Sequence, residues 1–252
     1  MHKQESLFYY LLRLGDNALI LGHRLSEWCS RGPILEEDLA LTNMSLDQIG
    51  RANALLTYAG EVEGKGRTAD DLAYKRGERE FYNNLMHELP NGDFAFTMAR
   101  QLILSTFELN LYQRLCESSD LTLSALAAKA VKESRYHSAH ARDWNLRLGK
   151  GTEESHRRLQ QAYNELWMYT GELFEMYDAD ALLANEKIAC DLNLVKATTT
   201  EQLLAAMRQA DITMPMVDYM QTGSRAGIHT EHLGHLLSEM QYLQRAYPDA
   251  KW

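Results

Sequence analysis

The sequence of 252 residues is poor in proline, cysteine and uninterrupted apolar runs. Its four prolines all fall where helical periodicity also breaks, which indicates a mostly helical chain and disfavours a β-sheet. The three cysteines form no CxxC pair, so we expect neither a disulfide framework nor a zinc knuckle, and a reducing compartment fits best. No apolar run approaches the roughly 18 residues of a membrane span. We therefore expect a soluble, cytoplasmic protein.

Basic residues are fewer than acidic ones, 26 Lys and Arg against 35 Asp and Glu, so the formal net charge is −9. Nucleic acids and anionic membranes both require a basic surface, so neither is an expected partner. The glycines match no phosphate-loop motif. The remaining composition is that of an ordinary globular protein. We predict one domain over residues 1–252, with a core bundle over about 6–177 and a C-terminal helical extension over about 178–252.

Apolar residues recur at alternating spacings of three and four along most of the chain. This periodicity predicts long helices over about 6–30, 34–59, 93–116 and 121–148. Asp93 is expected to cap the third of them, and Gly149 to end the fourth. Further helices are predicted over about 71–89, 152–177 and 230–246. A capping box of Thr199 with Gln202 predicts one more short helix. The pattern indicates an all-α, ferritin-like four-helix bundle with additional C-terminal helices.

The helix predicted over 121–148 carries polar residues on what we expect to be its core face. The polar and aromatic members of this stripe are Glu133, His137, His140 and Trp144. Glu133 and His137 are four residues apart, so both side chains could reach one ion or each other. A buried carboxylate neutralised by a nearby His, or by Lys132, is the simpler interpretation, and we favour it.

The motif of carboxylate-bridged di-iron bundles is missing from the long helices. Such bundles supply a Glu from each of two helices and a Glu-x-x-His pair from each of the other two. Here Asp47 is followed three residues later by Gly50, and Glu133 by Tyr136. Both histidines of the pattern are therefore absent, which indicates a degraded site.

The first and third long helices offer the other carboxylates, Asp16 or Glu27 and Glu108. Each lies off the main apolar stripe of its helix and could face solvent. We predict no catalytic, metal-binding or cofactor-binding residue in the chain. The candidates for the degraded di-iron site are Asp16, Asp47, Gly50, Glu108, Glu133, Tyr136 and His137.

A second group of potential ligands lies near the C-terminus and comprises His229, Glu231, His232 and His235. The apolar stripe of the helix predicted there places His235 and Tyr242 on its opposite side. We expect this polar face to contact solvent or a partner subunit rather than a metal ion.

Five stretches together resemble one protein family: LRLGDNALILGHRLSEWC, DLALTNMSLDQIGRA, PNGDFAFTMARQ, AKAVKESRYH and HTEHLGHLLSEMQYLQR. This is the family of the C subunit of the bacterial phenylacetyl-CoA 1,2-epoxidase, and the resemblance covers nearly the whole chain. It implies a structural, non-catalytic subunit of a monooxygenase complex that epoxidises the aromatic ring of phenylacetyl-CoA in phenylacetate catabolism. It also implies a catalytic A subunit, which holds the di-iron centre. A reductase subunit would deliver electrons from NADPH through FAD and an iron–sulfur cluster. Whether Lys65 and Arg67 touch the CoA phosphates stays open.

The main hypothesis is therefore that the chain is not an enzyme by itself and holds no cofactor. We expect it to form a hetero-oligomer with the catalytic A subunit and the other subunits of the epoxidase. Self-association is left open. The alternative is an independent ferritin-like di-metal oxidoreductase or metal-binding protein. Its ligands would come from Asp16, Asp47, Glu108, Glu133 and His137. A plain helical protein would leave the polar stripe of the 121–148 helix unexplained.

Overall fold

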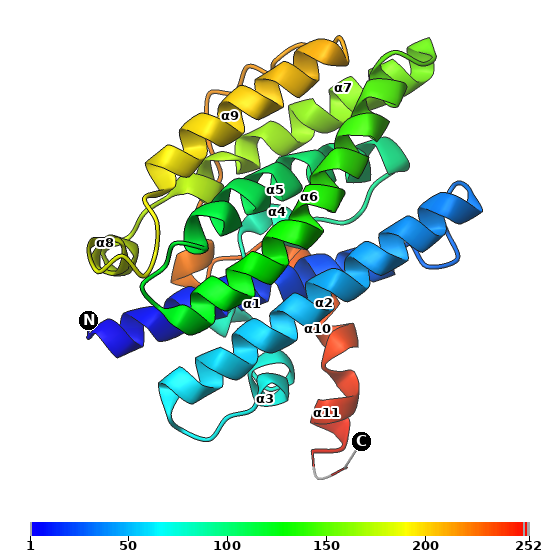
Figure 1. Ribbon diagram of the computed structural model, residues 1–252. Coiled ribbons are helices and arrows are strands. Elements are labelled where there is room, and N and C mark those ends of the chain that lie inside the picture. Colours follow the sequence, from blue (N-terminus) through cyan, green and yellow to red (C-terminus); the bar gives the residue numbers. More distant parts are fainter. Residues whose placement is uncertain (1, 249, 251–252) are drawn as a thin grey trace. The chain divides into compact units, whose positions relative to one another are not determined.

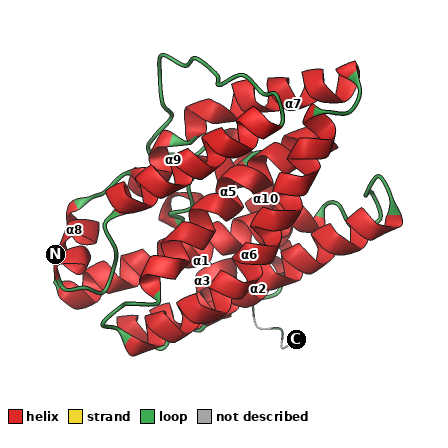
Figure 2. Cartoon of the chain, turned by 45° about the horizontal axis from the view of Figure 1, so that its top comes forward, coloured by secondary structure: helices red, strands yellow, loops and turns green. Residues whose placement is uncertain are grey.

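The computed structural model describes residues 2–248 and 250. Over these residues the chain consists of helices and connecting segments without a β-strand, so the all-α prediction is confirmed (Figure 2). Contacts divide the chain into two compact units. One comprises residues 1–90 and 223–252, and the other residues 91–222.

The first unit is built on a hairpin of α1 (Lys3–Ser26) and α2 (Leu35–Glu63), which lie side by side in Figure 1. Eighteen of the 24 residues of α1 are buried, so this helix is covered on more than one side. Such burial agrees with its sequence, which carries apolar residues on two faces. Gly64 caps the C-terminus of α2, and its φ of +70° lies in the left-handed region that glycine adopts without strain.

The prediction of one helix over residues 71–89 is wrong. The chain instead forms α3 (Ala69–Tyr74), a 3₁₀ turn (Glu78–Glu80) and α4 (Leu85–Glu88). The segment between them is extended because side chains of α1 accept its backbone N–H groups. Asp16 accepts from Tyr82 N (2.9 Å), and the Asn17 side-chain oxygen accepts from Asn84 N (2.8 Å). These bonds replace the ones that a helix would have made within itself.

The C-terminal residues of the first unit form a 3₁₀ turn (Ser224–Ala226), α10 (Glu231–Met240) and α11 (Tyr242–Ala246). The predicted 230–246 helix is therefore interrupted at Gln241. The buried Gln241 side chain donates to the carbonyl oxygens of Ala73 (3.2 Å) and Arg76 (3.0 Å). This residue fixes the C-terminal helices to the end of α3.

The second unit contains a hairpin of α5 (Phe94–Leu115) and α6 (Leu121–Gly149), against which α7 (Glu153–Leu166) and α9 (Leu192–Gln209) pack. A short α8 (Asp178–Asn185) precedes α9. Asp93 caps α5 as predicted, since its side chain accepts from Phe96 N. Two predictions fail here. The 152–177 helix ends at Leu166 and continues as 3₁₀ turns (Trp167–Tyr169, Gly171–Phe174). Thr199 is not a cap, because it lies buried in the middle of α9.

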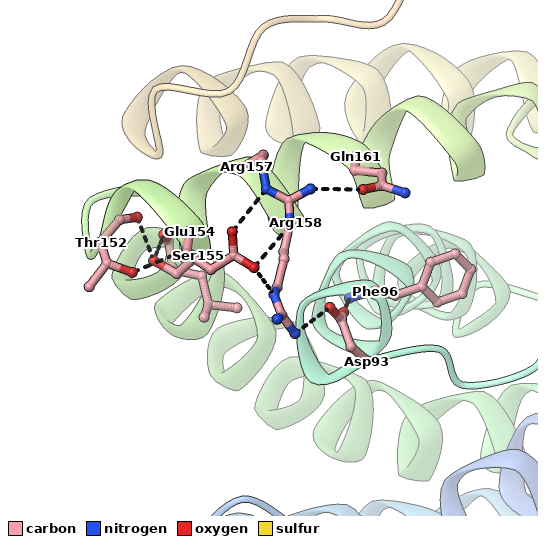
Figure 3. A network of polar contacts seen from close by, with 9 residues as sticks. Asp93, Phe96, Thr152, Glu154, Ser155, Arg157, Arg158 and Gln161 are labelled. Carbon is pink, nitrogen blue, oxygen red and sulfur yellow. Dashed lines mark hydrogen bonds and ion pairs between the residues drawn. The ribbon is translucent and has the colours of Figure 1, made fainter.

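The start of α7 carries an exposed network of charged side chains (Figure 3). Glu154 accepts from Arg157 (2.9 Å) and Arg158 (2.7 Å), and these hydrogen bonds lower the pKa of Glu154 to about 2. Arg158 also lies 3.4 Å from Asp93, the cap of α5. Because every partner is exposed to water, this network contributes little to the free energy of unfolding. Substitutions in it can therefore serve as controls for substitutions in buried ion pairs.

Two glycines of α2 differ in what an added methyl group would meet. At Gly60 it would collide with the carbonyl oxygen of Arg67, whereas at Gly50 it would meet nothing within 4 Å. We expect Gly60→Ala to lower the free energy of unfolding by about 1–3 kcal/mol. Gly50→Ala is expected to raise it by about 0.5–1 kcal/mol, because alanine is the better helix former. Urea unfolding followed by circular dichroism measures both, and changes of the same sign would contradict this packing.

Candidate functional site

Asp16, expected to be able to face solvent, is fully buried and bound by three donors. Both terminal nitrogens of Arg76 donate to its carboxylate, Nη1 at 3.0 Å, and Tyr82 N donates at 2.9 Å. Arg76 is buried as well and also donates to the carbonyl oxygen of Glu80 (2.7 Å). The ion pair therefore ties α1 to the segment that follows α3, and a metal ion could reach Asp16 only by displacing the guanidinium.

The other residues of the first unit that were candidates for the di-iron site are poorly suited to bind a metal ion. Asp47 is half-buried on α2, and Gly50 has no side chain with which to bind an ion. Glu27 lies just beyond α1, where its carboxylate accepts from Arg24 (2.7 Å).

In the second unit the buried face of α6 is displaced from the predicted stripe. Its centre is formed by Ala130, Ser134, His137 and Ala141. Glu133 lies at the edge of that face, with Lys129 Nζ 3.6 Å from its carboxylate. His140 is half-buried, and Tyr136 is exposed. On α5 Glu108 is buried, so the expectation that it could face solvent is wrong as well.

The residues present do not fit a di-iron centre. The Asp16 carboxylate is held by Arg76, Gly50 lacks a ligating atom, and Tyr136 is exposed. In the described part of the chain no three His, Cys, Asp or Glu side chains are placed to hold a metal ion.

The C-terminal group of potential ligands separates into exposed and buried members. His235 is exposed, as expected, and Glu231 is exposed too. The side chain of His229, by contrast, is fully buried beside the equally buried Glu88, with Nδ1 2.9 Å from the carboxylate. The other ring nitrogen, Nε2, lies 2.9 Å from the carbonyl oxygen of Phe81. Because a carbonyl oxygen only accepts, Nε2 must carry a proton.

Glu88 is the centre of a buried network that joins α4, α1 and the start of α10. Its carboxylate also accepts from Thr230 N (2.6 Å) and from the side chain of Asn83 (2.9 Å). Its backbone carbonyl accepts from Arg24 at 3.0 and 2.7 Å, and Arg24 donates further to the carbonyl oxygen of His232 (3.2 Å). Sequence reasoning missed this network, because no spacing pattern relates residues 88 and 229.

A pocket of about 500 Å³ lies in the first unit between the start of α1 and the end of α2. Its wall includes Phe8, Tyr9, Lys65 and Arg67. Glu63 accepts from the Arg67 guanidinium (2.7 Å) and lies 3.4 Å from Lys65 Nζ, and these partners keep its pKa below the ordinary value. Both cations thus have an acidic partner within the chain, which weighs against a role in binding CoA phosphates.

Burial lowers the pKa of His23 below its ordinary value of 6.5. As the pH falls through 6.5, the unfolded chain therefore takes up a proton before the folded chain does, and the free energy of unfolding falls. We expect His23→Gln to lose less stability than the parent chain between about pH 7.5 and 5.5. Urea midpoints at the two pH values measure this, with the exposed His235→Gln as control. Equal losses in the parent and His23→Gln would contradict the assignment.

Among the described helices, none combines the length and the apolar character needed to cross a membrane.

The comparisons with known proteins cover the whole chain. Residues 1–252 match the family model described as phenylacetic acid catabolic protein. A relative from Escherichia coli (strain K12), the C subunit of 1,2-phenylacetyl-CoA epoxidase, is 47% identical over 248 residues, which cover 98% of this chain and 100% of the relative. The predicted ferritin-like class and the predicted resemblance are both confirmed. The chain therefore belongs to the phenylacetic acid catabolic protein family.

Proposed function

We propose that the chain is a structural, non-catalytic subunit of a di-iron monooxygenase complex that epoxidises the aromatic ring of phenylacetyl-CoA. The name of its relative supports membership of the epoxidase. The observation that carries the non-catalytic role is the buried ion pair of Asp16 with Arg76, which occupies the carboxylate that an iron ligand would need. The same observation weighs against an independent di-metal oxidoreductase.

The role of such a subunit is to support the catalytic one, and α2 offers a surface for that contact. Three leucines on this helix are unusually exposed: Leu35 at 71%, Leu39 at 55% and Leu46 at 64%. Their spacings of four and seven place them on one face of the helix, and Gly50 continues the same face one turn later. We call Leu35, Leu39, Leu46 and Gly50 the leucine face. Exposed apolar patches of this kind mark protein contacts.

The occupant we assign to the leucine face is a helix of the catalytic subunit. The apolar side chains supply an area that a partner can remove from water. Gly50 lets a second backbone approach closely, since nothing lies within 4 Å of the position of its missing Cβ. We further propose that the complex is cytoplasmic and that a reductase subunit delivers electrons from NADPH to the catalytic subunit.

Co-expression with the catalytic subunit tests the proposal. We expect the two chains to co-purify, and we expect turnover of phenylacetyl-CoA to fall when this chain is omitted. The double variant Leu39→Ser, Leu46→Ser is expected to weaken the complex by about tenfold or more. Its free energy of unfolding should stay close to that of the parent, because both side chains already face water.

Leu121→Ser is the matched control, because Leu121 is an exposed leucine at the start of α6. It should leave the affinity unchanged. The proposal is wrong if no stable complex forms, or if the catalytic subunit turns over phenylacetyl-CoA equally well alone.

A further inference from the structure

The connection between α9 and the 3₁₀ turn at Ser224 exposes large apolar side chains instead of the polar residues usual in loops. Met214 is 50% exposed, Met216 99% and Tyr219 60%. All three lie within residues 213–222, which we call the methionine loop. It belongs to the second unit. Apolar side chains gathered on one short segment indicate a contact with another molecule.

Both ends of the methionine loop are fixed to the body of the second unit. At one end the side-chain amide of Gln160, on α7, accepts from Thr213 N (2.8 Å) and donates to Thr213 O (2.9 Å). At the other end Gln221 N donates to the carbonyl oxygen of Met168 (2.7 Å), and Thr222 Oγ1 donates to Glu175 (2.8 Å). The exposed side chains are therefore presented from a loop with anchored ends, which reduces the entropy lost on binding.

A buried proline separates the two most prominent methionines. Pro215 is buried, whereas Met214 and Met216 on either side of it are exposed. Proline fixes its own backbone angle and restricts the residue before it. The structure thus holds the backbone while leaving the two flexible thioether side chains free to adapt to the shape of a binding partner.

We propose that the methionine loop is a docking element, and that Met214, Met216 and Tyr219 enter an uncharged apolar pocket on another protein subunit of the epoxidase complex. This inference rests on the proposed function, since it needs a complex. Methionine and tyrosine are enriched at the centres of protein interfaces. An unbranched methionine also fills irregular pockets better than a branched side chain.

The charges around the loop favour a protein partner over a membrane surface. The methionine loop itself, residues 213–222, contains no Lys or Arg and one acidic residue, Asp218, and the nearest basic residues along the chain are Arg208 and Arg225 outside it. Segments that bind anionic lipid carry basic residues beside their apolar ones. A second copy of this chain is the other protein that could bind the methionine loop, and the concentration dependence of oxidation distinguishes it from another subunit.

Oxidation by hydrogen peroxide measures whether the loop is covered. Peroxide transfers one oxygen atom to the thioether sulfur, which becomes a sulfoxide, and water is released. In the free chain we expect Met216 to oxidise first and the buried Met44 and Met98 to stay intact. In the complex purified with its other subunits, oxidation of Met216 should slow by about tenfold or more, because a buried thioether is screened from peroxide. Peptide mass analysis gives both rates.

Two substitutions of Met216 separate apolar docking from mere proximity. Met216→Leu keeps an apolar side chain of similar size, and we expect its affinity for the complex to change by less than about threefold. Met216→Gln places a polar group in the pocket, and we expect the affinity to fall by about tenfold or more. Both variants should fold as the parent does, because the side chain faces water. Leu194→Gln, at a half-exposed leucine of α9, is the control and should leave the affinity unchanged.

The outcomes separate this inference from the proposed function. If the complex forms but Met216 oxidises equally fast in it, the docking loop is wrong and the proposed function stands. If no complex forms, both are wrong. If oxidation of the free chain slows as its concentration rises and a dimer appears, the loop binds a second copy and the assignment to another subunit is overturned.

Discussion

Replacing Asp16 by alanine is expected to lower the free energy of unfolding by about 3–5 kcal/mol. The substitution leaves the buried Arg76 guanidinium without its carboxylate and removes the acceptor of Tyr82 N. An uncompensated buried charge is costly because its lost hydration is no longer offset by a partner. Urea unfolding at pH 7 measures the loss.

A carboxylate kept only for a metal ion would behave in the opposite way. Without the metal its removal would leave stability unchanged or raise it, and that outcome would contradict the structural role. The double variant Asp16→Leu, Arg76→Met replaces both charges by apolar side chains and is expected to recover part of the loss. Glu133→Ala serves as a comparison, because Glu133 lies at the edge of the buried face of α6 near the exposed Lys129. Its effect should be smaller.

Glu88→Ala is expected to cost a similar amount, about 3–5 kcal/mol, and to loosen the C-terminal helices. It leaves three buried or part-buried groups without their acceptor: the His229 ring, Thr230 N and the Asn83 amide. Since the first two precede α10 directly, amide hydrogen exchange in α10 should accelerate more than exchange in α5, which belongs to the other unit.

Glu88→Gln should cost less than Glu88→Ala, because its amide oxygen can still accept from Thr230 N. The matched surface control is Glu154→Ala, whose exposed carboxylate pairs with two exposed arginines. We expect that variant to unfold almost as the parent does. Equal effects of Glu88→Ala and Glu154→Ala would contradict the assignment of Glu88 as the buried centre of the network.

The long helices could be predicted because their periodicity is local. The predicted starts and ends of α5 and α6 agree closely with the structure, and Asp93 caps α5 where the sequence places it. Helix α6 ends at Gly149 as predicted, with Lys150 at its C-cap. The 71–89 segment could not be predicted in this way. Its backbone conformation depends on Asp16 and Asn17, which are more than sixty residues away in the chain. Local propensity gives no information on such partners.

In the candidate site, too, features that depend on local spacing could be predicted and features that depend on distant residues could not. The sequence shows that neither Asp47 nor Glu133 is followed three residues later by histidine, because a Glu-x-x-His motif has a fixed spacing on a helix. The apolar residues on two faces of α1 indicate burial on more than one side, but no pattern singles out Asp16 or Glu108, since a helix that is covered on several sides has no single apolar stripe that marks its interior. The Asp16–Arg76 and Glu88–His229 contacts join residues 60 and 141 positions apart, so only the folded chain brings them together.

A carboxylate buried inside a helical bundle needs a partner that balances its charge. In this chain Arg76 supplies the positive charge beside the buried Asp16. Because this charge is part of the chain itself, the buried carboxylate is balanced without a bound ion.

The iron content of the purified chain, alone and after separation from its complex, distinguishes a structural subunit from a metal-binding one. For a structural subunit we expect no stoichiometric iron on this chain in either state, with the iron of the complex remaining on the catalytic subunit. About two irons bound per chain, lost in Glu133→Ala, would contradict it.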